Sequence, residues 1–475
     1  MKLSAFFLLF LFCFTSYSRI IQVGQNKQYT LPSQGLSAAQ DGDTVEIDAG
    51  IYTGDVCTWN KNNLLVRGVG GYAHLAAGGK NAGGKAIWVV TGNNNVIEYI
   101  EFSDCTVPDS NGAGIRFEGT NLTIRHCNFH DNEDGILTSA NDSSDIVIES
   151  SEFARNGYGD GYSHNLYIGH VRSLTFRFNY SHHAKIGHNL KSRASTNYIL
   201  YNRIMDEETG NSSMLIDLPN GGKSYIIGNL LMQGPLAENR KLISYGADDL
   251  TNPDSVLYVV NNTMVNKRTA GATFVYIQKG TKEARIINNI FTGPGEVLLG
   301  SADTVTNIHF EDVEQAYFAD EANYDYRIFF RSPAFDAGTA LGSVAGFSLV
   351  PEYEYIHPMS YTLRLIYDYI DIGAYEAPPL GVEDDLSLLS LSVYPNPCTD
   401  EASISFNLEM EQNINLNILD LLGDVCYSLN TGVLNEGMNK ININYDVFVK
   451  MQTGTYFLTL SSTYFTLTEI LKVVK

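Results

Sequence analysis

A short pattern of apolar and polar positions recurs eight times between residues 97 and 291. An apolar residue is followed three positions later by a distinctive residue and, in most copies, two positions further on by a second apolar residue. The spacing between successive copies ranges from 23 to 33 residues. The apolar residues that open the copies are Ile97, Ile124, Ile148, Phe176, Ile199, Ile226, Val259 and Ile286.

A period of this length, in a stretch rich in Val, Ile, Asn and Gly and without helical periodicity, predicts a β-solenoid. Each copy is expected to form one coil of several short strands separated by turns. Stacked coils pair each strand with the equivalent strand of the next coil at about 4.8 Å. The sequence therefore predicts an all-β domain whose strands run parallel.

The middle position of the pattern predicts an asparagine ladder. A side-chain amide at a turn both donates and accepts, so stacked amides satisfy polar groups that would otherwise be buried without partners. We interpret the ladder as structural, since function in repeat folds usually lies on outward faces. Its residues along the chain are Ile100, Cys127, Ser151, Asn179, Asn202, Asn229, Asn262 and Asn289.

Segments at both ends of this region resemble pectate-lyase-like right-handed parallel β-helices. Residues Asp41 to Val45 and Ala49 to Tyr52 are similar to the entry of that fold, and Ser332 to Gly338 and Asp371 to Glu376 to its closing segments. The resemblance implies a right-handed parallel β-helix over residues 19–377. It does not choose an activity, because the superfamily includes lyases, hydrolases, epimerases and non-catalytic binders.

The repeat stops at a linker, expected at residues 378–386, that combines Pro378-Pro379 with the acidic Glu383 to Asp385. Alternating Ile, Asn, Leu and Tyr then predict a small antiparallel β-sandwich over residues 387–475. Its segments Val393 to Pro397 and Gly454 to Leu458 resemble the C-terminal sorting domain of type IX secretion cargo. That resemblance implies export across an outer membrane by the type IX machinery; the alternative is a carbohydrate-binding sandwich.

The N-terminus predicts a signal peptide at residues 1–18. Lys2 precedes an apolar run from Leu3 to Phe14, followed by the small residues Ser16 and Ser18. Twelve apolar residues are too few to span a bilayer, and no later apolar stretch is long enough. We therefore expect a secreted or cell-surface protein without a transmembrane segment.

Net charge and cysteine content exclude further classes of protein. The formal net charge of −22 argues against a nucleic-acid partner, because phosphate binding needs a basic face. The five cysteines after the signal peptide are too few and too scattered for a disulfide framework. A single bridge between Cys398 and Cys426 remains open.

The candidate catalytic residues lie between Gly161 and Met205. This 45-residue stretch has no Asp or Glu and holds five of the ten histidines. Two of its segments, beginning at His164 and His188, are 24 residues apart, which is close to one coil. They should therefore stack. If Leu166 and Leu190 face the core, strand alternation turns their neighbours outward. Those neighbours are Asn165, Tyr167, Asn189, Lys191 and Arg193.

These residue types suit a lyase that cleaves a uronate-containing polysaccharide by β-elimination. Arg193 would clamp the substrate carboxylate, and Lys191 would act as base, because nearby cations depress its pKa. Tyr167, His188 or His164 would protonate the leaving oxygen. Asn165, Asn189 and Asp217 are expected to bind substrate, with Asp217 pairing with Lys191 or Arg193 or helping to bind a cation.

Other interpretations stay open. A non-catalytic glycan-binding or adhesin-like surface would use outward tyrosines, namely Tyr162, Tyr167, Tyr180, Tyr198 and Tyr201. A glycoside hydrolase would need two carboxylates, for which Asp134 and Asp160 are the fallback pair. Calcium is a possible cofactor in a lyase, but no specific set emerges from the candidate ligands Asp131, Asp134, Asp142 and Asp160.

Overall fold

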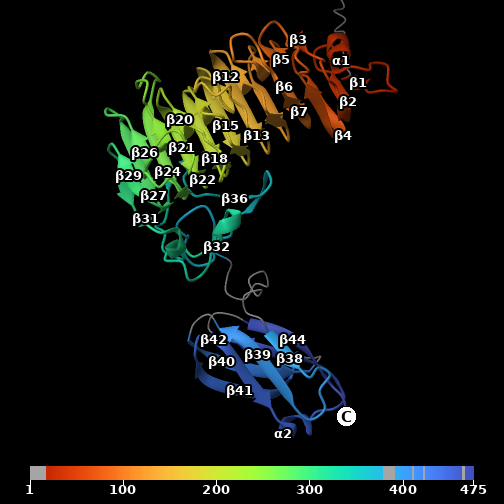
Figure 1. The fold of residues 1–475 in the computed structure, drawn as a ribbon, viewed down its shortest axis with the longest axis vertical. Helices are drawn as coiled ribbons and strands as arrows, with labels where there is room; N and C mark the ends of the chain where they lie inside the picture. The colour runs from red at the N-terminus through yellow and green to blue at the C-terminus, as the bar shows by residue number, and fades with distance from the viewer. Residues whose placement is uncertain (1–17, 378–390, 409–410, 421–422, 463–465) are drawn as a thin grey trace, which may run out of the picture. The chain divides into compact units, whose positions relative to one another are not determined.

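The computed structural model describes residues 18–377, 391–408, 411–420, 423–462 and 466–475. The expected linker and the expected signal peptide before Ser18 lie outside these ranges. The chain divides into two compact units, residues 1–377 and 378–475 (Figure 1). Among the described residues, neither helix has the length and apolar character needed to cross a bilayer.

The first unit is a parallel β-solenoid with three faces. One face is a ten-stranded sheet in which each strand pairs with the equivalent strand of the next coil. Its strands are β3 (Cys57–Trp59), β5 (Ala86–Val90), β8 (Ala113–Phe117), β11 (Asp134–Thr138), β14 (Leu166–Ile168), β17 (His188–Ser192), β20 (Met214–Leu218), β23 (Lys241–Tyr245), β26 (Ala272–Ile277) and β29 (Gly295–Leu299).

The other two faces form one bent sheet of 21 strands, because β4 (Leu65–Ala76) spans the bend and pairs with a strand on each side of it. The second face holds β1 (Ile20–Val23), β2 (Thr44–Ile51), β6 (Asn95–Glu98), β9 (Leu122–Arg125), β12 (Asn141–Glu149), β15 (Val171–Arg177), β18 (Thr196–Leu200), β21 (Gly222–Ile227), β24 (Ser255–Val260), β27 (Glu283–Ile287) and β30 (Asp303–Val305). The third face holds β7 (Ile100–Ser103), β10 (Asn128–His130), β13 (Glu152–Ala154), β16 (Tyr180–His182), β19 (Arg203–Met205), β22 (Leu230–Gln233), β25 (Thr263–Asn266), β28 (Ile290–Thr292) and β31 (Ile308–Phe310).

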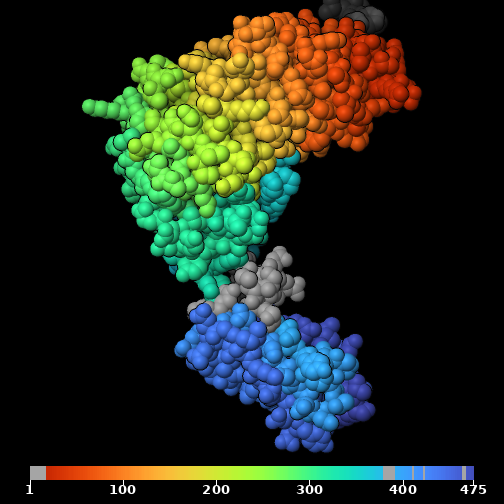
Figure 2. Space-filling view, in the orientation of Figure 1, coloured from red at the N-terminus to blue at the C-terminus, as the bar shows by residue number. Residues whose placement is uncertain are grey.

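The interior is filled by inward residues of all three faces, which stack in columns from coil to coil. The rings of Phe102, Phe129 and Phe153 stack with centroids 4.9 Å apart at each step. This spacing matches the separation of paired strands, so identical side chains at one position form a continuous column. Figure 2 shows the surface colours following one another in chain order along this unit, as coil stacking requires.

The predicted asparagine ladder is confirmed. The Asn202 backbone N–H and side-chain amide both donate to Asn229 Oδ1, each at 2.9 Å, and Asn229 donates to Asn262 in the same way. The ladder continues beyond the predicted set to Asn307. All the asparagines from 179 to 289 in it are fully buried, so every amide replaces hydrogen bonds that water would otherwise make.

Segments before and after the coils pack against the solenoid. Helix α1 (Pro32–Ala38) buries Leu36 against the first coils. Residues after β31 form three short hairpins that pack along the outside of the second and third faces, where Tyr361 stacks on Phe178 with centroids 4.0 Å apart. The hairpin strands are β32 (Phe318–Asp320), β33 (Asp325–Ile328), β34 (Ser343–Val344), β35 (Phe347–Ser348), β36 (Tyr353–Ile356) and β37 (Ser360–Leu363), with 3-10 turns at Val313–Ala316 and Glu321–Asn323.

The second unit is the predicted antiparallel sandwich, with two sheets in the orders β38-β39-β42 and β41-β40-β43-β44. Its strands are β38 (Leu391–Tyr394), β39 (Ala402–Leu408), β40 (Gln412–Leu419), β41 (Val425–Leu434), β42 (Gly437–Ile443), β43 (Gly454–Ser461) and β44 (Thr466–Val473), with helix α2 (Tyr445–Phe448). Strand β39 alternates buried and half-buried residues along its whole length, as the sequence pattern predicts. Cys398 is buried and Cys426 exposed, and both are free thiols, so the possible disulfide is absent from the described chain.

Candidate functional site

The predicted site lies on the ten-stranded sheet, where three outward side chains meet on adjacent coils. Tyr167 on β14 is in register with Lys191 on β17, and Lys191 with Asp217 on β20. Each lies between two fully buried residues of its own strand, so its side chain projects from the outer face. The prediction that segments 24 residues apart stack is therefore confirmed for Tyr167 and Lys191.

Arg193 follows β17 and joins this group through the tyrosine. Its Nε donates to Tyr167 Oη at 2.8 Å, its Nη1 donates to Asn220 Oδ1, and its Nη2 lies 2.9 Å from Asp248 Oδ2. The acidic partner of Arg193 is thus Asp248 rather than Asp217. Sequence reasoning missed both Asn220 and Asp248, which lie after later strands.

Lys191 is a largely buried cation whose pKa is lowered. Its Nζ lies 3.9 Å from Asp217 Oδ2, and its side chain is 16% exposed. Burial lowers the pKa of Lys191, and Arg193 lowers it further, while the Asp217 carboxylate opposes the shift. The predicted direction is confirmed, but burial rather than neighbouring cations is the main cause.

The pKa of Asp217 is higher than that of an ordinary exposed carboxyl group. Burial raises the pKa of Asp217 to about 6, although Lys191 and Arg193 favour its charged form. The expected pairing of Asp217 with Lys191 is confirmed by the distance between them. Lys191 therefore releases a proton more readily than an ordinary lysine, and Asp217 binds one more readily than an ordinary carboxylate.

The two histidines lie beneath this group rather than on its surface. The backbone N–H of His188 donates to Nδ1 of His164 at 3.0 Å, and the rings stack 4.6 Å apart. Burial lowers the pKa of His188 to about 3 and that of His164 well below its usual range. Both are neutral at physiological pH and shielded from solvent. Of the three predicted acids, Tyr167 is therefore the one whose side chain is accessible to solvent.

The expectation that Asn165 and Asn189 face outward is wrong, because both are fully buried. Asn165 Nδ2 donates to Asn189 Oδ1 at 2.9 Å, and Asn189 Nδ2 donates to Asp206 Oδ1 at 3.2 Å. The chain bends at this corner of the coil, so strand alternation does not hold there. The two amides form a second ladder that positions the start of each strand, with Asn132 and Asn156 as earlier members.

The tyrosines expected to form one glycan-stacking sheet do not lie together. Tyr180 is on β16 and Tyr201 follows β18, on other faces of the solenoid, and both are buried. Tyr198 on β18 stacks on Tyr225 with centroids 5.3 Å apart. Tyr162 is 86% exposed and precedes β14, so it remains an outward aromatic next to the candidate site.

Three of the four carboxylates considered for hydrolysis or calcium binding have other partners, and the fourth, Asp142, is exposed. Asp134 is 2% exposed and accepts the His164 backbone N–H at 2.7 Å, while Asp160 accepts that of Tyr162. Asp131 is held by Arg155 at 2.8 Å. In the described part of the chain, the one group of three metal-ligating side chains close enough to share an ion lies around Glu101, on the third face.

Comparison with known proteins agrees with this architecture. Residues 49–231 match the family described as right handed beta helix region, and residues 392–474 match the secretion system C-terminal sorting domain. Among solved structures, the chain is similar to pectate lyase Pel9A, with 15% identity, a TM-score of 0.53, and coverage of 76% of this chain and 97% of that one. Pectin methylesterase from Aspergillus niger aligns at 10% identity and a TM-score of 0.32, over 62% of this chain and 85% of that one. No curated protein matches the chain.

These matches define the class of protein. The first unit is a right-handed parallel β-helix of the pectate-lyase-like fold. The second unit is a type IX secretion sorting domain, which indicates export to the cell surface or the extracellular space. At 15% identity the likeness to Pel9A concerns the fold, so the activity has to be argued from the site.

Proposed function

We propose that this protein is an exported polysaccharide lyase that cleaves an acidic, uronate-containing polysaccharide by β-elimination on the outer face of its ten-stranded sheet. The observation that carries the proposal is Lys191, an outward lysine with a lowered pKa, flanked by Tyr167 and Asp217 on the adjacent coils. Such a lysine is suited to remove a proton from carbon.

In this mechanism neutral Lys191 takes the proton from the carbon next to the uronate carboxylate. The electron pair left on that carbon forms a carbon–carbon double bond, and the glycosidic carbon–oxygen bond on the neighbouring carbon breaks. Tyr167 gives its hydroxyl proton to the leaving oxygen. Because Arg193 Nε donates to Tyr167 Oη, the tyrosine hydrogen is free to point toward the substrate.

Charge developing on the uronate carboxylate needs a cationic partner, since removal of the adjacent proton spreads negative charge onto it. Arg193 fills this role if the substrate carboxylate replaces Asp248, whose side chain is 54% exposed, at Nη2. Asp217 then holds Lys191 in place. His164 and His188 support the site from below as buried neutral groups.

A test of the proposal uses the purified protein, a panel of uronate polymers, and the ultraviolet absorbance of the unsaturated product. We expect turnover on at least one polymer, and Lys191→Gln to lower kcat by about 100-fold or more, because it removes the general base. Lys223→Gln changes a half-buried lysine on the second face and serves as the matched control that keeps full activity.

Tyr167→Phe supplies an independent check, because it keeps the ring that Lys191 and Arg193 contact but removes the hydroxyl. We expect a loss of about 100-fold in kcat with substrate affinity retained. Full activity of either site variant removes that residue from the mechanism, and the absence of unsaturated product on every polymer rejects the lyase.

A second candidate function, non-catalytic glycan binding, is favoured by the exposed rings of Tyr158 and Tyr162 in the loop before β14. The same experiment separates the two functions. A protein that binds a polymer without forming unsaturated product, and loses that binding when Tyr162 is changed to Ala, is a binder rather than a lyase.

A further inference from the structure

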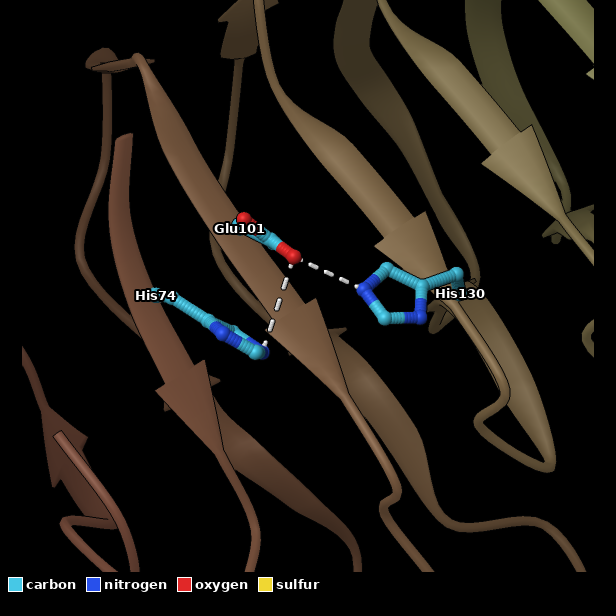
Figure 3. Close-up of side chains that lie close together, drawn as sticks. All are labelled: His74, Glu101 and His130. Atoms are coloured by element: carbon cyan, nitrogen blue, oxygen red, sulfur yellow. Dashed lines mark hydrogen bonds and ion pairs between the residues drawn. The ribbon is translucent and has the colours of Figure 1, made fainter. Parts of the chain in front are cut away.

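Three metal-ligating side chains meet on the third face of the β-helix, away from the candidate lyase site. His74 comes from the second half of β4, Glu101 from β7 and His130 from β10, so three consecutive coils contribute one residue each. Figure 3 shows both imidazoles turned toward the Glu101 carboxylate. Glu101 Oε1 lies 3.7 Å from His74 Nε2 and 2.9 Å from His130 Nε2.

We propose that His74, Glu101 and His130 form a binding site for Zn²⁺. Two imidazole nitrogens and one carboxylate oxygen, with a water in the fourth position, form a ligand set that this ion takes in tetrahedral geometry. Bonds of that kind place ligand atoms about 3.3 Å apart. The two measured distances lie on either side of this value, and the three ligand atoms all lie within 4.8 Å of one another.

The surroundings of His130 are those of a metal ligand. Its Nδ1 lies 2.9 Å from Asp131 Oδ2, and Asp131 is fixed in turn by Arg155, whose Nη2 donates to it at 2.8 Å. A carboxylate at Nδ1 holds the ring and directs the other nitrogen at the ion, as outer partners of metal-bound histidines commonly do. In that tautomer the Nε2 lone pair points at the Glu101 oxygen, so a positive species lies between the two atoms: a proton in the unloaded chain, and Zn²⁺ after binding.

The protons displaced by Zn²⁺ binding are accounted for without any further reactant. In the unloaded chain Ser103 Oγ donates to Asp104 Oδ2 at 2.6 Å, so the Ser103 oxygen accepts the Nε2 proton of His74 at 2.8 Å. When Zn²⁺ binds at Nε2, the neutral His74 ring carries its proton on Nδ1 instead, and any proton held between Glu101 and His130 passes to solvent.

Two further observations favour an ion at this place. Asn128 is in register with Glu101 on the neighbouring strand, and its Oδ1 is buried without a hydrogen-bond partner among the described residues. A water bound to the ion would supply the missing donor. The His74, Glu101 and His130 side chains are each 20 to 22% exposed, so an ion reaches them from solvent.

The test uses the full-length protein without a histidine tag, treated with a chelator and then dialysed against Zn²⁺ alone. We expect one ion bound per chain. We also expect about 100-fold weaker binding in each of the three single variants His74→Gln, Glu101→Gln and His130→Gln, and about 10-fold weaker binding in Asp131→Asn. The matched control is His182→Gln, which changes another histidine of the same face that contacts one glutamate, Glu152, at 3.1 Å.

Several results overturn the proposal. If the unaltered chain binds Zn²⁺ no more tightly than His130→Gln does, the three side chains form an ion pair and not a metal site. If His182→Gln weakens Zn²⁺ binding as much as the three site variants do, Zn²⁺ binds histidines non-specifically. Co²⁺ in place of Zn²⁺ gives a check that needs no variant, because a tetrahedral site produces intense visible bands and their absence contradicts it. No polysaccharide takes part, so the outcome is independent of the proposed lyase activity.

Discussion

Burial, more than charge pairing, sets the chemistry of single residues at the candidate site. It lowers the pKa of Lys191 and raises that of Asp217, and in each case it outweighs the charged neighbours. His188 is the extreme case, because its Nδ1 is buried without a hydrogen-bond partner among the described residues. A protonated ring there would be a buried charge whose nearby carboxylate oxygen, Asp217 Oδ2, lies 3.9 Å away, beyond hydrogen-bond distance, which is costly.

His188 should make the protein less stable in acid. Burial lowers its pKa in the folded chain to about 3 from an ordinary value of 6.5, so below pH 6.5 the unfolded chain takes up a proton that the folded chain does not. The stabilisation by neutral His188 is complete above pH 6.5 and is lost as pH falls toward 3. His188→Gln should therefore reduce the loss of unfolding free energy between pH 7 and 4.5 by about 2–3 kcal/mol, measured by urea unfolding.

Asp217 supplies the control for this measurement because its shift has the opposite sign. Its pKa is raised to about 6 in the folded chain, so acid stabilises the folded state through this group as pH falls through 6 toward the ordinary carboxyl value. Asp217→Asn should therefore enlarge the acid-induced loss. If His188→Gln leaves the pH dependence unchanged, His188 does not titrate as a buried neutral ring.

The sequence predicted part of the site and misplaced several other residues. Spacing by one coil predicted that Tyr167 and Lys191 would be neighbours, and strand alternation predicted that they face outward. Asp248 was beyond reach, because it contacts Arg193 from a loop 55 residues further on that carries no repeat signal. Asn165 and Asn189 were misplaced because alternation fails where the coil bends.

At the scale of strands and turns, the asparagine ladders hold the coils in register. The ladder from Asn179 to Asn289 was predictable, because its members recur at one position of the repeat. The second ladder was not, since Asn156 and Asn165 are only 9 residues apart and an intervening loop interrupts the period. Both serve the same purpose, which is to satisfy turn amides inside the solenoid.

Removal of one ladder amide should be costly. Asn229→Ala leaves the Asn202 backbone N–H and side-chain amide without their acceptor in a fully buried turn. We expect a loss of about 2–3 kcal/mol in unfolding free energy, measured by denaturant titration. Asn93→Ala in an exposed turn stack should cost less than about 1 kcal/mol, because water replaces its partners. Equal losses in the two variants would contradict a special role for the buried ladder.

At the scale of the whole chain, the protein consists of two units with separate hydrophobic cores. The core of the β-helix and that of the sandwich share no residue. The sequence predicted both folds, because each rests on a local periodicity. The hairpins between β31 and Ala377 were not predicted in detail, since their packing against Phe178 and Tyr201 depends on contacts distant in sequence.

A chain that ends at Ala377 should fold and act like the full-length protein but should not be exported. We expect an unchanged melting temperature for the β-helix and unchanged activity, because its core is complete without the sandwich. In a host with type IX secretion, immunoblots of medium and cells should find the truncated chain inside. Export of the truncated chain to the medium would show that residues 378–475 are not the sorting signal.

Stacking in strict register also limits how such a protein can evolve. Duplication of one complete coil adds a rung whose asparagine, phenylalanine and outward positions meet equivalent positions above and below, so the molecule lengthens without disturbing its neighbours. A one-residue deletion within a strand instead turns every following side chain of that strand to the opposite side. The β-helix should therefore lengthen in evolution by the gain of complete coils. Smaller insertions should be confined to loops such as the one before His164.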